Sequence, residues 1–428
     1  MSASVLIFLF IKKGLIIVKI SNVDVKTLKE KYGTPLYIYD VNHIKRNMDG
    51  YLNYFKSNEF ETEVLFASKA LNIKELIRIC MEKKISLDCV SVGEIYTAIK
   101  TGFNPSKIYF HGNNKTIEDL KFALNNNVGV IVCDNLMEVE CLNDLASSLN
   151  KNVKIMLRMN VGVDAHTHKF IVTAHVDSKF GVLYDSIDYK KILDIINNSK
   201  NIEFIGFHSH IGSQIFDLNA FKARAEKMVS YCKGFDKPLE LNLGGGYGVH
   251  YTDADSPIPF DIVSKTLINT VEETLKAQNV KIKKLLIEPG RSIVAEAGYT
   301  LYTIGYIKKT PNKEYYFIDG GMTDNIRPAL YQAKYDADIV GKENVKKDHI
   351  VTVAGKCCES GDLIIENYPL PEAKMGDLLI TYTTGAYGYS MSSNYNKALT
   401  PAIVFVEDGK DKLVVRRQTL DELIEREI

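Results

Sequence analysis

Leu239-Glu-Leu-Asn-Leu-Gly-Gly-Gly246 joins a short apolar run directly to three glycines, and runs of this kind decide the fold. Seven more such runs occur between residues 60 and 295, separated by stretches with helical periodicity. They lie at residues 64–67, 86–91, 108–111, 129–133, 153–158, 204–208 and 285–288. Their length, β-branched content and alternation with helical patterns predict βα units and a parallel sheet. Eight units are the number in an α/β protein with a (β/α)8 TIM barrel, and a doubly wound open sheet is the alternative.

Polar or glycine-rich residues follow these runs where the predicted strands end. Examples are Ser68-Lys-Ala70, Gly112-Asn-Asn114, Ser209-His-Ile-Gly-Ser213, Gly244-Gly-Gly246 and Pro289-Gly-Arg291. Barrel enzymes build their active sites at the carboxyl ends of the strands. We therefore expect the functional site among these residues.

After residue 295 the pattern changes to strand-like segments without amphipathic helices between them. These segments lie at residues 299–307, 315–318, 349–353, 377–382 and 402–406. They predict a C-terminal, mostly antiparallel β domain, either a barrel or a sandwich. The strand-like residues 34–39 precede the TIM barrel, and we expect this N-terminal strand to join the β domain. The predicted parts are an irregular extension over 1–20, a barrel over 40–295, and a β domain from 21–39 and 296–428.

The composition limits the classes of partner. Lys and Arg together number 53, as do Asp and Glu, so no basic excess points to nucleic acid or to a membrane surface. The seven cysteines are scattered without a Cys-x-x-Cys, which argues against disulfides and structural zinc and favours a reducing, cytoplasmic setting. The apolar residues 5–11 fall short of the ~20 needed to span a bilayer. We interpret them as part of an extension or of a start assigned too early, with a membrane anchor as the alternative.

Two candidate residue groups suit a phosphorylated carbonyl cofactor. Lys69 follows the first barrel strand among apolar neighbours, where a lysine loses its proton more easily and can form a Schiff base. The alternative is an ordinary surface lysine. Gly244, Gly245 and Gly246 would leave backbone N–H groups open to a phosphate, although a tight turn would explain them equally.

Two further groups suit an aromatic cofactor ring. In Glu288-Pro-Gly-Arg291 the carboxylate could keep a pyridine nitrogen protonated, while the arginine could bind a phosphate or carboxylate. A simple salt bridge is the alternative. In His208-Ser-His-Ile-Gly-Ser-Gln214 an imidazole could stack on the ring, and Ser213 could bind the phosphate. A metal pair of His208 and His210 is the alternative, but no third ligand lies nearby, so we expect no metal.

These motifs carry a family resemblance. Phe66-Ala-Ser-Lys-Ala70, His210-Ile-Gly-Ser-Gln214, the three glycines and Glu288-Pro-Gly-Arg291 resemble, in that order, the alanine-racemase-like (fold type III) pyridoxal-phosphate decarboxylases. Later motifs resemble the diaminopimelate decarboxylases, and the likeness covers about residues 25–415. They are Arg327-Pro-Ala-Leu-Tyr331, Cys358-Glu-Ser-Gly-Asp362 and Gly385-Ala-Tyr-Gly-Tyr-Ser-Met-Ser-Ser-Asn394. The chain departs from the family at Leu71, where Asn is common, and at Lys356-Cys357, where Gly-Pro usually precedes the cysteine; alignment on Glu-Ser-Gly-Asp selects Cys358.

The resemblance implies pyridoxal 5'-phosphate as the cofactor and a role for each residue. Lys69 would form the Schiff base, His210 would stack on the ring, and Glu288 would pair with the ring nitrogen. The remaining cofactor contacts would come from Ser213, Gly244, Gly245, Gly246, Gly290, Arg291 and Tyr387. Cys358 would donate the proton that replaces CO2, reaching the site from the neighbouring subunit. A homodimer with shared active sites follows from that arrangement.

The substrate prediction rests on charge. The distal end of meso-2,6-diaminopimelate carries a carboxylate and an ammonium. Arg291, Arg327, Tyr331 and Tyr387 would contact the substrate and its carboxylate, and Glu359 would contact the ammonium; an interface salt bridge is the alternative for Arg327. The expected reaction yields L-lysine and CO2, the last step of lysine biosynthesis. One alternative is a decarboxylase of ornithine, arginine or carboxynorspermidine; an extra arginine in the site would repel the cationic distal end of ornithine or arginine. The other alternative is a non-catalytic barrel that binds the cofactor or a partner.

Overall fold

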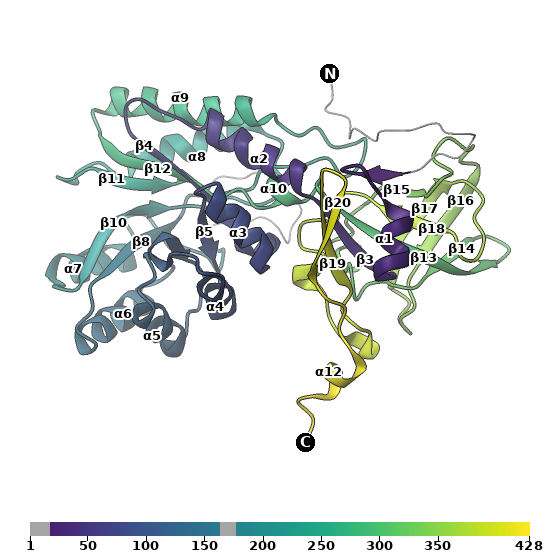
Figure 1. Cartoon of the computed structure of the whole chain (residues 1–428). Coiled ribbons are helices and arrows are strands. Elements are labelled where there is room, and N and C mark those ends of the chain that lie inside the picture. The colour runs from purple at the N-terminus through teal and green to yellow at the C-terminus, as the bar shows by residue number, and fades with distance from the viewer. Residues whose placement is uncertain (1–17, 163–176) are drawn as a thin grey trace. The chain divides into compact units, whose positions relative to one another are not determined.

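The computed structural model describes residues 18–162 and 177–428, which Figure 1 draws in colour. The chain forms two compact units. Of the described residues, the barrel unit contains those within Met48–Val249 and Ser256–Ser292, and the β unit contains 18–47 together with His250–Asp255 and Ile293–Ile428. Most of the extension predicted for residues 1–20 lies outside the described residues. Within the described ranges, no helix has the length and apolar character needed to cross a membrane.

Eight parallel strands close into a barrel in the first unit. They are β4 (Glu61–Ala67), β5 (Ser86–Cys89), β6 (Ile108–Phe110), β7 (Val130–Cys133), β8 (Val153–Asn160), β10 (Ile202–His208), β11 (Leu239–Asn242) and β12 (Ile282–Ile287). Each strand pairs with the next, and β12 pairs with β4, which closes the ring. The short β9 (Val182–Leu183) pairs in parallel with the end of β8. This topology confirms the predicted TIM barrel and excludes the open sheet.

Helices connect the barrel strands, and Figure 1 shows α4 to α9 on the outside of the barrel. Helix α2 (Val41–Tyr54) leads into the first barrel strand. The connecting helices are α3 (Lys74–Glu82), α4 (Val92–Thr101), α5 (Ile117–Asn125), α6 (Leu136–Ser148), α7 (Ile187–Asn198), α8 (Leu218–Ser230) and α9 (Phe260–Gln278). Five of them begin at a polar residue whose side chain accepts a hydrogen bond from a first-turn N–H, which satisfies an otherwise unpaired donor. These residues are Ser91, Thr116, Asn135, Ser186 and Asp217.

Mostly antiparallel strands form the β unit, as predicted. The main path runs β17-β16-β14-β13-β3-β19-β20, and β18 pairs with both β13 and β15. The strands are β3 (Leu36–Asp40), β13 (Gly298–Lys309), β14 (Glu314–Ile318), β15 (Ala337–Ile339), β16 (His349–Ala354), β17 (Leu363–Leu370), β18 (Leu378–Thr381), β19 (Ala402–Glu407) and β20 (Lys410–Val415). The N-terminal β3 lies between β13 and β19, so its predicted place in this unit is confirmed.

Short elements complete the β unit. A separate hairpin of β1 (Lys19–Ile20) and β2 (Val23–Asp24) leads into α1 (Val25–Tyr32). The other helices outside the barrel connections are α10 (Arg291–Val294), α11 (Arg327–Tyr331) and α12 (Leu420–Ile424). The sequence did not predict β15, β17 or β20. Strand β15 has three residues, and β17 and β20 end the sheet path, where half-exposed strands carry polar side chains that hide the apolar pattern.

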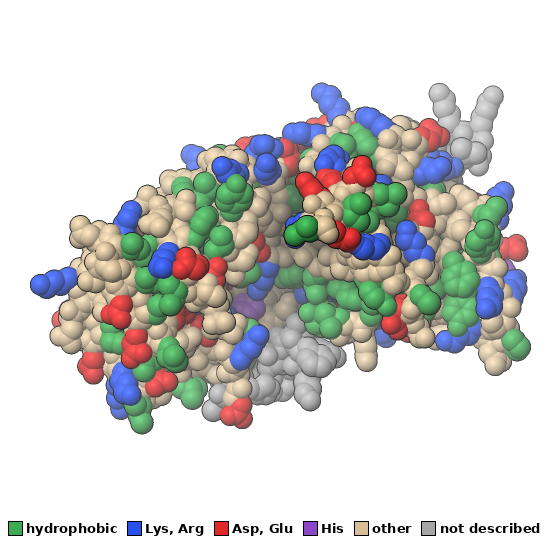
Figure 2. Space-filling model, turned by 90° about the horizontal axis from the view of Figure 1, so that it is seen from below, with side chains coloured by type: hydrophobic (Ala, Val, Ile, Leu, Met, Phe, Trp, Pro, Cys, Tyr) green, Lys and Arg blue, Asp and Glu red, His purple; other side chains and the backbone are tan. Residues whose placement is uncertain are grey.

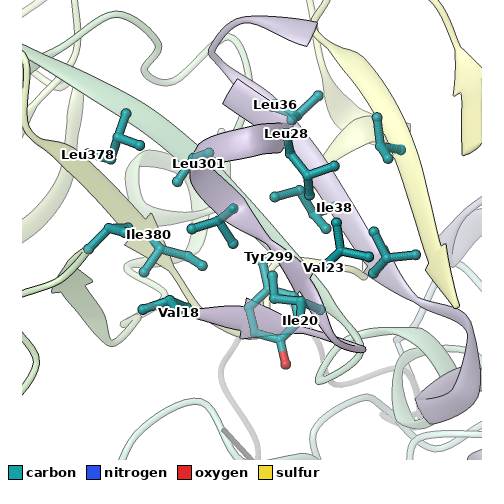
Figure 3. Close-up of a cluster of buried hydrophobic side chains, with 14 of the residues drawn as sticks. Val18, Ile20, Val23, Leu28, Leu36, Ile38, Tyr299, Leu301, Leu378 and Ile380 are labelled. Atoms are coloured by element: carbon teal, nitrogen blue, oxygen red, sulfur yellow. The ribbon is translucent and has the colours of Figure 1, made fainter. Parts of the chain in front are cut away.

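Each unit has its own buried core. In the barrel, six buried side chains from five strands pack together: Leu65, Tyr109, Val130, Val132, Met156 and Leu286. In the β unit, Figure 3 shows Val18, Ile20 and Leu28 from the N-terminal segment beside Leu301 and Ile380 from the C-terminal part of the chain. Val18 and Ile20 are therefore part of this core.

Charges of both signs cover the surface. On the face drawn in Figure 2, lysine and arginine side chains alternate with aspartate and glutamate side chains, without a large area of one sign. This distribution agrees with the balanced numbers of acidic and basic residues.

Replacing Leu301 with alanine should destabilise the β unit. Leu301 is 0% exposed on β13, which pairs with three other strands, and Leu→Ala changes at such sites cost ~2–5 kcal/mol. Tyr306→Ala on the same strand is the control, because Tyr306 is 76% exposed. Urea denaturation followed by circular dichroism would measure both variants. An equal midpoint for the two variants would contradict the described core.

Candidate active site

Lys69 lies directly after β4, in the single turn Ser68–Ala70. Its side chain is half-buried at the carboxyl end of the barrel strands. The ring of His210 is close enough to Lys69 to be influenced by its charge. Burial and, after it, the charge of Lys69 hold the pKa of His210 well below its usual range. The N–H of Gly245 donates to Nδ1 of His210 at 3.3 Å, which fixes the orientation of a neutral ring. The barrel therefore brings together an amine and a neutral, oriented imidazole.

Glu288 follows β12 and is buried within a set of polar side chains. Asn242 Nδ2 donates to Oε1 of Glu288 at 2.6 Å, and His208 Nε2 lies within hydrogen-bond distance of Oε2 at 3.1 Å. His111 Nε2 lies 3.0 Å from Oε1. Burial alone would raise the pKa of Glu288, but His111 and His208 hold it well below the usual range. The carboxylate is therefore ionised in the interior of the barrel.

This carboxylate fits the ring nitrogen of pyridoxal phosphate. A carboxylate accepts about four hydrogen bonds, and three described groups contact that of Glu288. No lysine or arginine among the described residues forms an ion pair with it. An ionised, buried carboxylate with remaining acceptor capacity is a suitable partner for a cationic N–H.

The three glycines form a close-packed turn after β11. Gly244 and Gly246 have positive φ angles of 64° and 102°. A Cβ on Gly245 would lie 2.3 Å from the carbonyl oxygen of Glu288, so only glycine fits there. The N–H of Gly246 donates to no residue that the structure describes. Such a turn, with an available N–H and no side chains, fits a phosphate group.

Ser213, Gly290 and Arg291 belong to the same unit. Arg291 is buried, and its Nη2 donates to Oγ of Ser213 at 2.9 Å. A Cβ on Gly290 would lie 2.8 Å from Cβ of Ala67, so glycine allows the segment after β12 to pack against the end of β4. All the cofactor residues predicted from the barrel thus lie on segments that follow the carboxyl ends of its strands. Their individual roles stay predictions.

Arg327 lies at the start of α11 in the β unit and is buried, with 7% of its surface exposed. Its Nη1 donates to the hydroxyl of Tyr335, and its guanidinium lies 5.0 Å from the ring centroid of Tyr251 and 5.6 Å from that of Tyr335. Within the part of the chain that the structure describes, Arg327 forms no ion pair. Among the described residues, aromatic rings rather than a carboxylate therefore contact this buried cation.

The cysteine motif forms a loop around Asp362 in the β unit. The buried Asp362 accepts hydrogen bonds from the N–H groups of Met322 at 2.6 Å and of Cys357 at 2.8 Å. Cys357 is half-buried, and burial together with Asp362 raises the pKa of its thiol to about 11. Cys358 is exposed, and its N–H donates to Oδ1 of Asn396 at 3.0 Å. Accessibility therefore favours the same cysteine as the sequence alignment.

The other predicted substrate residues also belong to the β unit. Glu359 is exposed beside Cys358, Tyr331 is half-buried at the end of α11, and Tyr387 is half-buried with a φ of 62°. The structure describes them, with Arg327 and Cys358, within the β unit alone. Lys69 and the predicted cofactor residues other than Tyr387 are described within the barrel unit.

Sequence reasoning missed Asp88, His111 and Asn242, and it assigned no role to His208 beyond a metal pair. Each lies at, or directly after, the end of a barrel strand, and that position was the available signal. His208 does have partners distant in sequence, since ligand atoms of His111, His208 and Glu288 lie within 4.8 Å of one another. These three groups could hold a metal ion. However, Asn242 and His208 already occupy hydrogen-bonding positions on the two carboxylate oxygens of Glu288.

Comparisons with known proteins agree with this geometry. Residues 41–295 match the family model described as the pyridoxal binding domain of pyridoxal-dependent decarboxylases. The class of protein is therefore a pyridoxal-dependent decarboxylase. The chain is 46% identical to the diaminopimelate decarboxylase of Bacillus methanolicus, over 94% of each chain. It is 43% identical to that of Bacillus subtilis, over 96% of this chain and 95% of the relative.

A solved structure agrees as well. The diaminopimelate decarboxylase of M. jannaschii in complex with L-lysine superposes with a TM-score of 0.90 at 32% identity, covering 98% of this chain and 97% of the other. The chain belongs to the diaminopimelate decarboxylase family. The expected cofactor, pyridoxal 5'-phosphate, follows from the family and fits the residues around Glu288.

Replacing Gly245 with alanine should weaken binding of pyridoxal phosphate by ~10-fold or more, because over-packing of this kind costs ~1–3 kcal/mol. Absorbance titration of the cofactor-free protein would measure the dissociation constant. Gly93→Ala is the control, since a Cβ there meets only Oγ of Ser91 at 3.7 Å. Equal dissociation constants for the two variants would contradict a phosphate site at the glycine turn.

Proposed function

We propose that this chain decarboxylates meso-2,6-diaminopimelate to L-lysine and CO2, with pyridoxal 5'-phosphate as the cofactor. The observation that carries the choice of substrate is the buried guanidinium of Arg327, which aromatic rings hold and no described carboxylate neutralises. A buried cation is costly without a counter-charge, so a substrate carboxylate is its natural partner. The family relatives, which are named for this substrate, support the same choice.

The barrel residues would hold the cofactor. The amine of Lys69 would attach to its aldehyde, the glycine turn and Ser213 would bind its phosphate, and Glu288 would pair with its ring nitrogen. When bound, pyridoxal phosphate supplies an electron-withdrawing ring that delocalises the electron pair left behind by CO2. The neutral ring of His210 offers a flat face without adding positive charge beside Lys69. In the β unit, Tyr387 would add a phosphate contact.

The residues of the β unit would recognise the substrate and complete the reaction. Arg327 would bind the distal carboxylate, and Glu359 would attract the distal ammonium. Ornithine and arginine carry only a cation at that end, which Arg327 would repel. Cys358 would hold a proton on Sγ and deliver it to the carbon that carried CO2.

We also propose that the protein is a homodimer with shared active sites. Cys358 and Glu359 are exposed on a loop that the buried Asp362 holds in place, an arrangement suited to reaching a second copy. Each site would then combine Lys69 from one subunit with Cys358 from the other.

Release of CO2 from meso-diaminopimelate, ornithine, arginine and lysine tests the substrate. The protein with pyridoxal phosphate should release CO2 from meso-diaminopimelate with the highest kcat/KM. Arg327→Met should lower that value by about 10- to 100-fold, because a hydrogen bond to a charged group contributes ~1.5–3 kcal/mol. Lys69→Ala is the inactive control. Preference for ornithine over meso-diaminopimelate would refute the substrate assignment.

A mixing experiment tests the shared sites. Cys358→Ser should lower kcat by ~100-fold or more, whereas Cys357→Ser should leave it nearly unchanged. Mixing inactive Lys69→Ala and Cys358→Ser chains should restore about a quarter of wild-type activity, since half the dimers regain one intact site of two. If mixing restores no activity while the chains do exchange subunits, the two residues act within one chain.

A further inference from the structure

His111 is a buried histidine that lies against two carboxylates. It follows β6 directly and is 4% exposed. Its Nε2 lies 3.0 Å from Oε1 of Glu288 and 3.7 Å from Oδ1 of Asp88, which comes from the neighbouring β5. That oxygen of Asp88 is itself buried, and it has no hydrogen-bond partner in the described part of the chain. His111 Nε2 likewise forms no hydrogen bond within the described part of the chain, although both of its close neighbours are carboxylate oxygens. Because both neighbours are acceptors, we infer that this nitrogen carries a hydrogen.

The two histidines around Glu288 are not equivalent. Their rings meet edge to face at 4.7 Å, too close for both to carry charge in a buried site. His208 faces Glu288 alone, and burial lowers its pKa to about 3, so it is a neutral donor. For His111 burial acts in the same direction, but the carboxylates of Asp88 and Glu288 outweigh it and raise the pKa above its usual value. The cation of this cluster is therefore on His111.

Charged groups from several strands face this cluster. Arg158 on β8 opposes protonation of His111, since it adds positive charge. Burial raises the pKa of Asp88, and the positive charges of Lys69 and Arg158 oppose that rise. Burial raises the pKa of Glu94, at the start of α4, to about 7. The charge of Asp88 adds to this rise, and the charges of Lys69 and His111 oppose it. Two carboxylates at ion-pair range of one imidazole remain the strongest feature of its surroundings.

We propose that His111 is a positioning residue: as an imidazolium it balances Asp88, so that Glu288 stays an ionised carboxylate available to the ring nitrogen of pyridoxal phosphate. This inference rests on the proposed function, because it concerns the same cofactor site. In this role His111 would contact neither the cofactor nor the substrate, and it would act through Glu288. Without its charge, Asp88 and Glu288 repel each other and must share a proton, and a protonated Glu288 is a poor partner for a cationic N–H. Any negative charge left in excess would also oppose binding of the anionic cofactor.

A charge-balanced set of variants tests the proposal. His111→Gln keeps a hydrogen-bond donor and removes the cation, and Asp88→Asn removes the carboxylate that the cation balances. We expect His111→Gln alone to weaken binding of pyridoxal phosphate to the cofactor-free, full-length protein by about tenfold or more. The double variant, in which both charges are absent, should bind within about threefold of wild type. Absorbance titration gives the dissociation constants, and circular dichroism checks that each variant is folded.

The outcomes separate charge from packing. If His111 acts only through shape or hydrogen bonding, one of two results is expected. Either His111→Gln binds pyridoxal phosphate like wild type, or the loss of affinity in His111→Gln adds to the loss in Asp88→Asn when the two changes are combined. Either result overturns the inference while leaving the proposed function intact. Rescue by Asp88→Asn supports it even if His111→Gln is unstable, since a merely structural defect would persist in the double variant. Failure of the wild type to bind pyridoxal phosphate would overturn the proposed function itself.

Discussion

The buried carboxylate of Glu288 is the constraint on which the catalytic end of the barrel depends. A charge in the interior is tolerated only when neighbouring groups compensate the loss of water. Here those groups come from three other strands: Asn242 from β11, His208 from β10 and His111 from the end of β6. In this chain the closed ring of strands brings these residues, which are distant in sequence, into contact with one side chain. The ionised state of Glu288 thus depends on the folded barrel.

The two ends of the barrel treat charge differently. At the amino ends of the strands, Glu63 accepts a hydrogen bond from Lys284 at 2.8 Å and one from Ser86, and these partners lower its pKa although burial opposes the shift. Lys284 also lies 3.8 Å from Glu240. These charges compensate one another, as expected of a face that contributes stability. At the carboxyl ends, Glu288 and Asp88 keep acceptor capacity that the described residues do not use.

Much of the fold followed from the sequence, because apolar runs and glycine-rich ends mark barrel strands locally. The glycine triplet, Lys69 and Glu288 could be found because each directly follows a strand. Asp88 and His111 lie at similar positions, but their partners come from strands distant in sequence, and only the folded barrel identifies those partners. Strand β20 was missed because its exposed residues, such as Lys412 and Leu413, lack the alternation of a half-buried strand. The choice between Cys357 and Cys358 depended on family alignment, and only the folded loop adds their accessibility.

The place of β3 in the β unit has a consequence for the order in which the protein can mature. This strand is synthesised near the start of the chain, yet one of its two neighbours, β19, begins at Ala402. The whole barrel sequence leaves the ribosome before that neighbour exists, so β3 must wait with an open edge. An unpaired apolar strand edge is a template for association with other chains. This edge of β3 is thus exposed in the nascent chain until β19 (Ala402–Glu407) has been synthesised.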